Sequence, residues 1–480
     1  MSLSSALSTA QSSIRNVGRQ TSIVSRNVLE ANNPDYNRRT AVVASTAPGA
    51  HVVQVQRATS DQLFRQNLGA LSQWSGQSAL YSGMERLGIS VNGIDNASSP
   101  ATAIGRLQEA MQLYSSAPSN QNLAENALDA ARQVVRSLND GTAAIQSFRS
   151  QADVEIAGAV GELNTLLADF KNSNDLVIAG TRAGRDVSDQ LDQRDATLKK
   201  IAEYLPVTTF TRGDNDMVVM TNDGTMLFEA IPRAVTFTPS SVLAAGVPGN
   251  SVYVDGVAVR GTNPASGKLA GLTQLRDSVT TTMQSQLDEV ARGLITAFSE
   301  TAPAQPDAPG LFTWPGAPGM PAAGTLVSGL AGSISLNAAM DSAQGGNPSL
   351  LRDGGANGAA YVVNTLGGSS YSNLLIAYSD RMTTQMAFDP AAGINPNTSL
   401  SDFSTNAIGW FEGLRQTAST TLQNSEALAV RTAEALSNDT GVNVDMEMSL
   451  LLDLEHSYQA SARLISTIDE MLTALLAAVR

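Results

Sequence analysis

Apolar residues recur at alternating steps of four and three positions at both ends of the chain. The N-terminal series is Leu3, Leu7, Ala10, Ile14, Val17, Thr21, Val24, Val28 and Ala31. The C-terminal series is Leu451, Leu454, Tyr458, Ser461, Ile465, Ile468, Leu472, Leu475 and Val479. This spacing is typical of helices that wind around each other and meet along one apolar seam. It predicts two long terminal helices that pair as a coiled coil.

Helical periodicity continues between the two ends. The first helix should end at Asn32, Asn33 and Pro34, because a proline disfavours helical geometry in the residue before it. Two extended stretches, 39–45 and 52–55, should follow it. Further helices are predicted at residues 61–87, as two long helices between 123 and 170, and at 186–204, 272–298 and 402–436.

A β-rich segment interrupts these helices. Residues 207–237 are rich in β-branched and aromatic side chains. At 252–259, strand formers flank Asp255 and Gly256, a pair that favours a two-residue hairpin turn. Residues 301–400 hold nine of the chain's 18 prolines and 14 of its 39 glycines, a composition that favours loops and short strands.

The predicted fold class is therefore mainly α with inserted β material, and the parts are nested. The helical segments stand towards both ends of the sequence, and the β material lies between them. The expected parts are a terminal coiled-coil domain (1–60 and 440–480), a helical bundle domain (61–205, 269–300 and 401–439), an inserted β domain (206–268) and a Gly/Pro-rich outer segment (301–400).

Composition excludes several classes of function. The net charge of −14 argues against a nucleic-acid partner, because phosphate binding needs a basic surface. Cysteine is absent, which excludes disulfides and thiolate chemistry, and His51 and His456 are the only histidines. We expect no catalytic residue, metal or cofactor. No stretch has the length of a membrane span, and the start lacks the layout of a cleavable signal peptide.

Three acidic residues are spaced as candidates for a metal site. Asp189, Asp192 and Asp195 lie at i, i+3 and i+6. We interpret them instead as the solvated start of a helix, with Arg185 and Arg194 near enough in the sequence to pair with them.

The two ends carry opposite charge. Residues 1–40 hold five arginines against one glutamate and one aspartate, whereas residues 442–480 hold six acidic residues against two arginines. Opposite charge selects a partner, while apolar burial supplies most of the binding free energy. Each seam must pair within the chain, pair with another copy, dock on a different partner, or stay disordered. We expect the ends of an isolated chain to be mobile and to become ordered on assembly.

Both ends also carry motifs of a known family. Residues 25–38 read SRNVLEANNPDYNR, which resembles the signature S-N-N-I-A-N-A-N-T-P-G-Y-S-R of the bacterial flagellar axial proteins. At the other end, TGVNVDMEM (440–448), SYQASARLI (457–465) and DEML (469–472) resemble the matching C-terminal signature. Asp35 stands where the family has glycine, Asn33 where it has threonine and Glu30 where it has asparagine.

Within this family, three features are similar to the subunits that join hook and filament. They are DQLDQRD (189–195), GLTQLRD (271–277) and the form of the motif at 440–447. The resemblance implies a non-enzymatic structural subunit in a junction ring, with another axial protein of the hook or distal rod as the alternative. It implies export to the extracellular flagellum by a type III route without a cleaved signal. The implied partners are further copies of the chain, the flagellar hook protein, hook-associated protein 3, and an export chaperone on the C-terminal helix.

Two further classes of function remain as alternatives. A peptidoglycan hydrolase would need a catalytic acid pair in a folded setting, which the sequence does not offer. A secreted adhesin is suggested by the Ser/Thr/Gly-rich composition and would act independently of flagella.

The assembly interface is expected on the two seams and on the bend after the first helix. The residues assigned to it are Leu3, Leu7, Ile14, Val17, Val24, Asn27, Val28, Pro34, Tyr36, Leu451, Leu454, Tyr458, Ile465, Ile468, Leu472, Leu475 and Val479.

Overall fold

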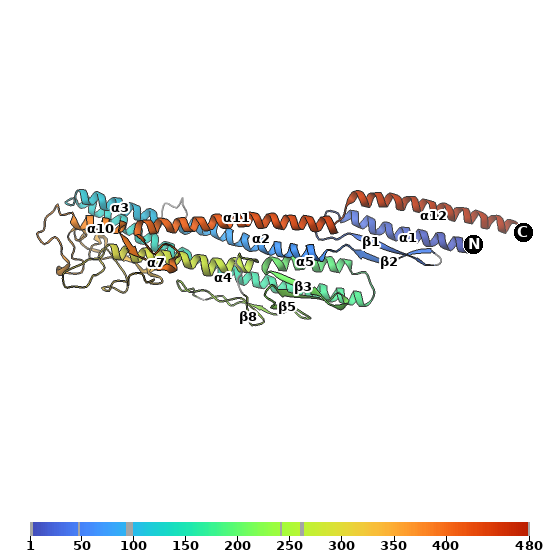
Figure 1. Ribbon diagram of the computed structural model, residues 1–480, viewed down its shortest axis with the longest axis horizontal. Helices are drawn as coiled ribbons and strands as arrows, with labels where there is room; N and C mark the ends of the chain where they lie inside the picture. Colours follow the sequence, from blue (N-terminus) through green and yellow to red (C-terminus); the bar gives the residue numbers. More distant parts are fainter. Residues whose placement is uncertain (1–2, 47–48, 93–98, 241, 260–263, 479–480) are drawn as a thin grey trace.

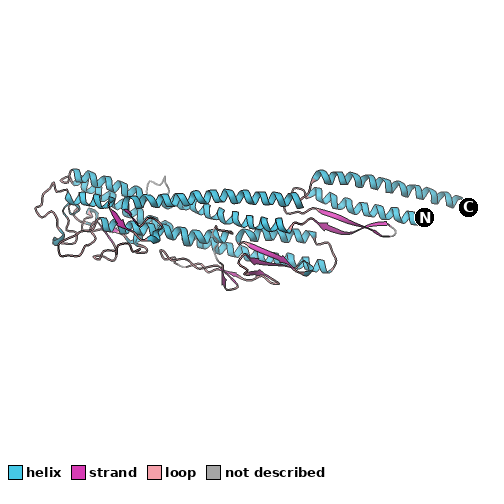
Figure 2. Cartoon of the chain, viewed as in Figure 1, coloured by secondary structure: helices cyan, strands magenta, loops and turns pink. Residues whose placement is uncertain are grey.

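The computed structural model is an elongated molecule with both chain termini at one tip (Figure 1). It describes residues 3–46, 49–92, 99–240, 242–259 and 264–478. Helices run along the long axis, and short strands lie beside them (Figure 2). Within these ranges, every helix falls short of the length and apolarity that crossing a membrane requires.

The narrow end of the molecule, which we name the terminal unit, consists of two helices and a hairpin. Helix α1 (Leu3–Leu29) lies against helix α12 (Val444–Ala478), and the two run antiparallel. Strands β1 (Arg39–Thr46) and β2 (Gly49–Arg57) pair antiparallel and pack on α1. Helix α1 therefore lies between α12 and the hairpin, while α12 is covered by α1 on one side.

The rest of the chain, which we name the body, is built on long helices. They are α2 (Asp61–Leu87), α3 (Pro100–Ser116), α4 (Gln121–Arg182), α5 (Ser188–Tyr204), α6 (Lys268–Gln274), the π-helical turn η3 (Leu275–Val279), α7 (Thr280–Ala297) and α11 (Leu400–Thr440). The prediction of two helices between 123 and 170 is wrong, because α4 is continuous over 62 residues. Its sequence contains no proline, so nothing removes a backbone donor from the helical ladder.

Two apolar cores lie along α4. The first half of α4 packs with α2, α3, α7 and α11, and its second half packs with α5, α6 and the β strands. Phe170 of α4 and Phe228 make an edge-to-face contact with ring centroids 5.0 Å apart in the second core. Each large apolar side chain buried in such a core stabilises the fold by about 1.5–3 kcal/mol.

The predicted β material forms two small sheets on the body. Strands β3 (Val207–Thr211), β4 (Met217–Thr221) and β5 (Met226–Phe228) make one antiparallel sheet. Strands β6 (Val235–Thr236), β7 (Tyr253–Val254) and β8 (Val257–Ala258) make the other. Asp255 and Gly256 both have positive φ, 50° and 81°, as the predicted two-residue turn requires.

Residues 301–400 cap the far end of the body and contain more helix than their composition indicates. Their elements are β9 (Phe312–Thr313), α8 (Leu330–Ser333), β10 (Ser335–Leu336), α9 (Leu350–Asp353), α10 (Asn373–Thr383), β11 (Gln385–Ala387) and β12 (Asn397–Ser399). Phe388 stacks on Phe403 of α11 with centroids 4.1 Å apart, and Tyr378 is fully buried beside Phe298. The segment therefore contributes to the first core. The predicted fold class, mainly α with inserted β material, is confirmed.

Candidate assembly site

The two apolar seams meet within one chain. Val17 and Val24 of α1 form a buried cluster with Leu454 of α12, and Leu451 packs on its edge. Ile468 is also buried. The remaining seam residues that are partly buried are Leu3, Leu7, Ile14, Val28, Ile465 and Leu472, whereas Tyr458 and Leu475 are exposed, and Val479 lies outside the described residues. In this arrangement each seam covers part of the other, and the mobility of the ends before assembly stays a prediction.

Two polar contacts fix the register of this helix pair. The Ser13 and Ser461 hydroxyl oxygens are 2.8 Å apart, and Asn27 Nδ2 donates to Glu447 Oε2 over 2.9 Å. One contact lies midway along α1 and the other at its end. Because the residue numbers rise along one helix as they fall along the other, the pair is antiparallel.

Asn27 is the centre of a buried polar cluster where α1 ends. Its side-chain oxygen accepts hydrogen bonds from the Tyr36 hydroxyl (2.8 Å) and the Arg39 backbone N–H (3.1 Å). Its amide nitrogen donates to the Arg39 carbonyl and to Glu447. Glu447 also accepts from Arg38 Nε at 2.6 Å. All four hydrogen-bonding positions of the Asn27 amide are used, so an isosteric apolar residue could not replace it.

The chain bends after α1, and side chains of this bend contact the body. Pro34 is exposed and Tyr36 is buried, with the Arg39 guanidinium 4.7 Å from the Tyr36 ring centroid. Burial raises the pKa of the Tyr36 hydroxyl. Asp35 accepts from Lys199 Nζ of α5 over 2.8 Å. Two residues predicted for the interface, Asn27 and Tyr36, therefore act together inside the chain.

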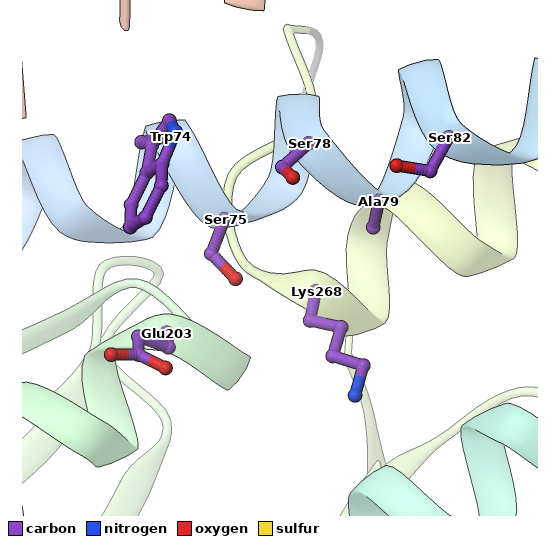
Figure 3. Close-up of a pocket in the computed structure, with 7 residues that line it drawn as sticks. All are labelled: Trp74, Ser75, Ser78, Ala79, Ser82, Glu203 and Lys268. Carbon is purple, nitrogen blue, oxygen red and sulfur yellow. The ribbon is translucent and has the colours of Figure 1, made fainter. Parts of the chain in front are cut away.

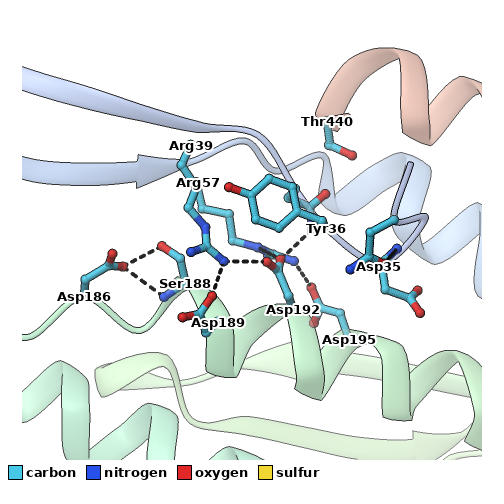
Figure 4. Close-up of polar contacts among 12 residues, drawn as sticks. Asp35, Tyr36, Arg39, Arg57, Asp186, Ser188, Asp189, Asp192, Asp195 and Thr440 are labelled. Carbon is cyan, nitrogen blue, oxygen red and sulfur yellow. Dashed lines mark hydrogen bonds and ion pairs between the residues drawn. The ribbon is translucent and has the colours of Figure 1, made fainter. Parts of the chain in front are cut away.

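The acidic residues of α5 face the terminal unit (Figure 4). Asp186 accepts hydrogen bonds from the Ser188 backbone and hydroxyl, which sets the start of α5. Spacing of three residues then places Asp189, Asp192 and Asp195 on neighbouring turns of one face. We name these three residues the acidic face of α5.

Three arginines of the terminal unit bind the acidic face of α5. Arg39 Nη2 contacts Asp189 at 2.5 Å and Asp192 at 2.9 Å. Arg57 contacts Asp192 and Asp195, both at 2.7 Å. Arg26 reaches Asp189 at 2.6 Å, and Asn37 donates to Asp192 at 3.0 Å.

Two sequence-based interpretations of these aspartates are therefore wrong. Asp192 and Asp195 are not solvated, since Asp192 is buried and the Asp195 carboxylate is engaged by Arg57, whereas Asp189 in the first turn of α5 stays half exposed. Their partners are not Arg185 and Arg194. Arg194 instead donates to Asn174 Oδ1 and to the Asn215 carbonyl. The spacing of the acids was visible in the sequence, but partners more than a hundred residues away had no local signal.

Burial and charge act against each other on this face. Burial alone would raise the pKa of Asp189, but the hydrogen bonds and charges of Arg39 and Arg26 outweigh it and lower that pKa. Burial raises the pKa of Asp195, and the charges of Arg57 and Arg194 oppose this only in part. Among the described residues, no three acidic or histidine side chains are grouped as metal ligands would be.

Helix α12 exposes many large apolar side chains outside its contact with α1. Its exposed side chains are Val444, Met446, Met448, Leu450, Leu452, Tyr458, Leu464, Met471, Leu475 and Leu476. Leu450, Leu464 and Met471 recur at multiples of seven residues, which places them on one face. We name Leu450, Leu464 and Met471 the outward stripe. The interface predicted from the sequence comprises the two seams and the bend and does not include this second stripe, although its spacing is visible in the sequence.

A cleft of about 850 Å³ runs beside the bend and is bordered by the 31–37 segment, the start of α2, residues 191–199 of α5, strand β3, the end of α11 and residues 441–442. A smaller hollow of about 240 Å³ lies between α2, α5 and α6, where Trp74 and three serines face Glu203 and Lys268 (Figure 3). Trp74 is half-buried there.

The geometry can be compared with known proteins. Residues 93–310 match the family model described as flagellar hook-associated protein FlgK helical domain, and residues 436–478 match the flagellar basal body rod FlgEFG protein C-terminal model. By both matches, the chain is similar to the class of flagellar axial proteins.

Within that class, the resemblance is to flagellar hook-associated protein 1, as the sequence motifs indicated. The chain is 25% identical to that protein of Escherichia coli K12 over 336 residues, which is 64% of this chain and 59% of the relative. For the Salmonella typhimurium protein the identity is 26% over 327 residues, 62% of this chain and 56% of the relative. The matches thus span less than two thirds of these relatives.

The fold is also similar to that of a solved structure. It is the flagellar hook junction protein FlgK from Burkholderia pseudomallei, with a TM-score of 0.56 and 13% sequence identity. The alignment covers 77% of this chain and 99% of that one. At this identity the likeness concerns the fold alone.

Proposed function

We propose that this protein is a non-enzymatic structural subunit of the bacterial flagellum that forms the junction ring between hook and filament. The observation that carries the proposal is the coincidence of a flagellar C-terminal family match at 436–478 with an exposed apolar stripe on the same helix. Leu450, Leu464 and Met471 are 36%, 58% and 54% exposed, so a partner that covers them gains up to about half of the roughly 1.5–3 kcal/mol that full burial of such a side chain provides.

The terminal unit is the proposed contact between copies. The seam residues hold α1 and α12 together, and the outward stripe of α12 then contacts a neighbouring copy. Arg15 and Arg19 are exposed on α1, and Asp453 and Glu455 are exposed on α12. The basic face of α1 in one copy can therefore attract the acidic face of α12 in the next copy. Contacts between unlike faces repeat from copy to copy and can close into a ring.

The remaining parts follow from this placement. The terminal coiled-coil domain lines the axis of the flagellum, the helical bundle packs beside its neighbours, and the β domain and the 301–400 segment face outward. The flagellar hook protein and hook-associated protein 3 are the proposed neighbours along the axis. An export chaperone would cover the outward stripe of α12 before type III export, which proceeds without cleavage of a signal peptide.

Deletion of the gene tests the role of the whole protein. The expected result is hooks without filaments in electron micrographs, with flagellin released into the medium. Loss of the hooks themselves would instead indicate a hook or rod subunit, and normal filaments would overturn the proposal. Complementation with the unaltered gene should restore the filaments.

Substitution of the outward stripe tests its part in assembly. Leu450→Glu with Leu464→Glu should fail to restore filaments in the deletion strain, since two charges enter the proposed interface. The matched control is Val430→Glu, an equally exposed apolar position on α11 of the body. Immunoblots of cells and medium show whether each variant is made and exported. Full complementation by the double variant would exclude the stripe as a contact.

A further inference from the structure

The hollow of about 240 Å³ between α2, α5 and α6 is lined mainly by polar side chains (Figure 3). Helix α2 contributes Trp74, Ser75, Ser78, Ala79 and Ser82, helix α5 contributes Glu203, and helix α6 contributes Lys268. Spacing of three and four residues places the α2 side chains on one face. A helix face that meets neighbouring helices normally carries large apolar side chains, so the small ones here leave the space unfilled.

Contacts on the adjoining face of α2 hold the walls of this hollow in place. Gln77 Nε2 donates to the Ala265 carbonyl over 2.9 Å. A Cβ on Gly76 would lie 2.6 Å from the same carbonyl oxygen, so the backbones of α2 and of the segment before α6 touch there. These contacts fix Lys268, the first residue of α6, relative to α2. The hollow is therefore formed by the fold of the body itself.

The polar groups around the hollow have unused hydrogen-bonding capacity. Helical serines elsewhere in the body, Ser150 among them, donate to the carbonyl four residues earlier. Within the described ranges, no hydrogen bond engages the three serine hydroxyls of the hollow, the indole N–H of Trp74 or the carboxylate of Glu203. The ammonium nitrogen of Lys268 lies 5.6 Å from the Tyr204 ring centroid. A ligand with both donors and acceptors would use these groups.

The two charged groups of the hollow have opposite sign. Burial raises the pKa of Glu203, and the charges of Lys200 and Lys268 oppose this. A ligand with a net charge of either sign would be repelled by one of the two groups. An apolar ligand would bury the hydroxyls and the charges without partners, which opposes binding. A neutral ligand with several hydroxyl groups can instead pair with all of them.

Trp74 adds a flat apolar surface to the hollow. Its indole ring is half-buried and lies across from Glu203 (Figure 3). The C–H face of a pyranose ring is also flat and apolar, and it stacks on the negatively polarised face of an aromatic ring. The hollow is smaller than the roughly 300–1,000 Å³ of sites that take drug-sized ligands, so its size suits a single sugar ring.

We propose that this hollow is a saccharide-binding site that takes one pyranose ring. Trp74 stacks on the face of the ring, and the hydroxyls of Ser75 and Ser78 exchange hydrogen bonds with the sugar hydroxyls. Glu203 accepts from the edge of the ring and Lys268 donates to it. The site belongs to the body alone. The inference therefore depends neither on the state of the chain termini nor on the proposed flagellar role.

Saturation-transfer difference NMR on the full-length protein tests this site. The probes are the methyl glycosides of glucose, galactose, mannose and N-acetylglucosamine. At least one probe should show saturation of its ring C–H protons, with a dissociation constant of about 1 mM, as the size of one sugar ring indicates. Trp74→Ala removes the stacking surface and should weaken binding by about tenfold. Ser78→Leu fills the hollow and should abolish the signal.

Two further variants separate binding from folding. Glu203→Gln keeps the volume of the side chain and removes its charge, so it should weaken binding by about fivefold with the fold unchanged. Trp314→Ala is the matched control, because Trp314 is also half-buried but lies in the 301–400 segment. It should leave binding unchanged. Far-ultraviolet circular dichroism should give the same helix content for all variants.

The outcomes that contradict the site are equally definite. Absence of saturation transfer to all four probes would overturn the inference. Transfer that Trp74→Ala, Ser78→Leu and Glu203→Gln leave unchanged would place the sugar elsewhere on the protein and would overturn it too.

Discussion

Asn27 and Glu447 are hydrogen-bonded over 2.9 Å, although 420 residues separate them in the sequence. Both side chains are fully buried, and they join the end of α1 to the first turn of α12. The partial positive charge at a helix N-terminus also favours the Glu447 carboxylate at that position. This contact makes the fold of one terminus depend on the presence of the other.

Replacing Asn27 should loosen the terminal unit selectively. Asn27→Ala leaves the Tyr36 hydroxyl and the Glu447 carboxylate each without one partner, which should cost about 2–3 kcal/mol of local stability. Hydrogen exchange should therefore accelerate in α1 and α12 and stay unchanged in α4. Asn32→Ala, at an exposed position three residues after α1, is the matched control. Equal exchange in the Asn27 and Asn32 variants would contradict the assigned role.

Pairing of the two seams within one chain is open to a direct chemical test. The Ser13 and Ser461 hydroxyl oxygens are 2.8 Å apart, so cysteines at both positions are near enough to oxidise to a disulfide. Ser13→Cys with Ser461→Cys should form an intrachain bond in dilute solution, detected as faster migration on a non-reducing gel. Ser13→Cys with Ser457→Cys, which places the second thiol one turn away on an exposed face, should not form it. If the first pair formed only covalent dimers, the seams would pair between copies instead.

The tight contact between α2 and α6 should tolerate no added methyl group. A Cβ on Gly271 would lie 2.4 Å from the Gly76 carbonyl oxygen, a backbone atom that cannot move aside. Gly271→Ala should therefore destabilise the body by about 1–3 kcal/mol. Gly69→Ala, also in a helix but with open space around it, should instead stabilise by up to about 1 kcal/mol. Denaturant unfolding of the two variants side by side measures the difference, and a shift of the same sign in both would contradict the close approach.

One carboxyl group in the first core should make stability depend on pH. Burial raises the pKa of Asp288 from 3.8 to about 6, although the backbone N–H groups of Ala331 and Gly329 donate to it. Because the folded-state pKa is the higher one, the folded protein binds this proton more tightly than the unfolded chain does. The resulting stability is fully present below the unfolded pKa and is lost as the pH rises through about 6.

The variant Asp288→Asn removes this titration. As the pH rises from about 4 to 7, the parent chain should lose up to roughly 3 kcal/mol of unfolding free energy relative to the variant. Chemical unfolding at several pH values measures that difference. A constant difference across the range would contradict a raised pKa at this site.

Local patterns predicted the helices well and the contacts between distant segments poorly. The bounds of α2 and the turn at Asp255 and Gly256 follow from periodicity and turn chemistry within a few residues. The continuity of α4 was missed because two apolar stripes along one helix, each facing a different core, resemble two separate helices. The packing of Tyr378 and Phe388 was missed because their ring partners, Phe298 and Phe403, lie outside the 301–400 segment.

The residues of the candidate site were likewise predicted from local motifs, whereas their distant partners were not. Asn27, Tyr36 and the seam residues lie within motifs that the sequence displays, and the structure brings them together in the terminal unit. The partners of Asp192 could not be chosen from the sequence, since Arg185 and Arg194 are nearer along the chain than Arg39 and Arg57. The fold decides between these arginines, because β1 and β2 run back towards α5 and place Arg39 and Arg57 beside Asp192.

The unbroken course of α4 has a mechanical consequence. A helix of 62 residues is about 93 Å long, and this one passes through both cores of the body. If such a rod turned rigidly by a few degrees at its α5 end, the tip that carries α3 and α10 would be displaced by about 5 Å. The position of the outermost surface is therefore set by the angle at the base of the molecule.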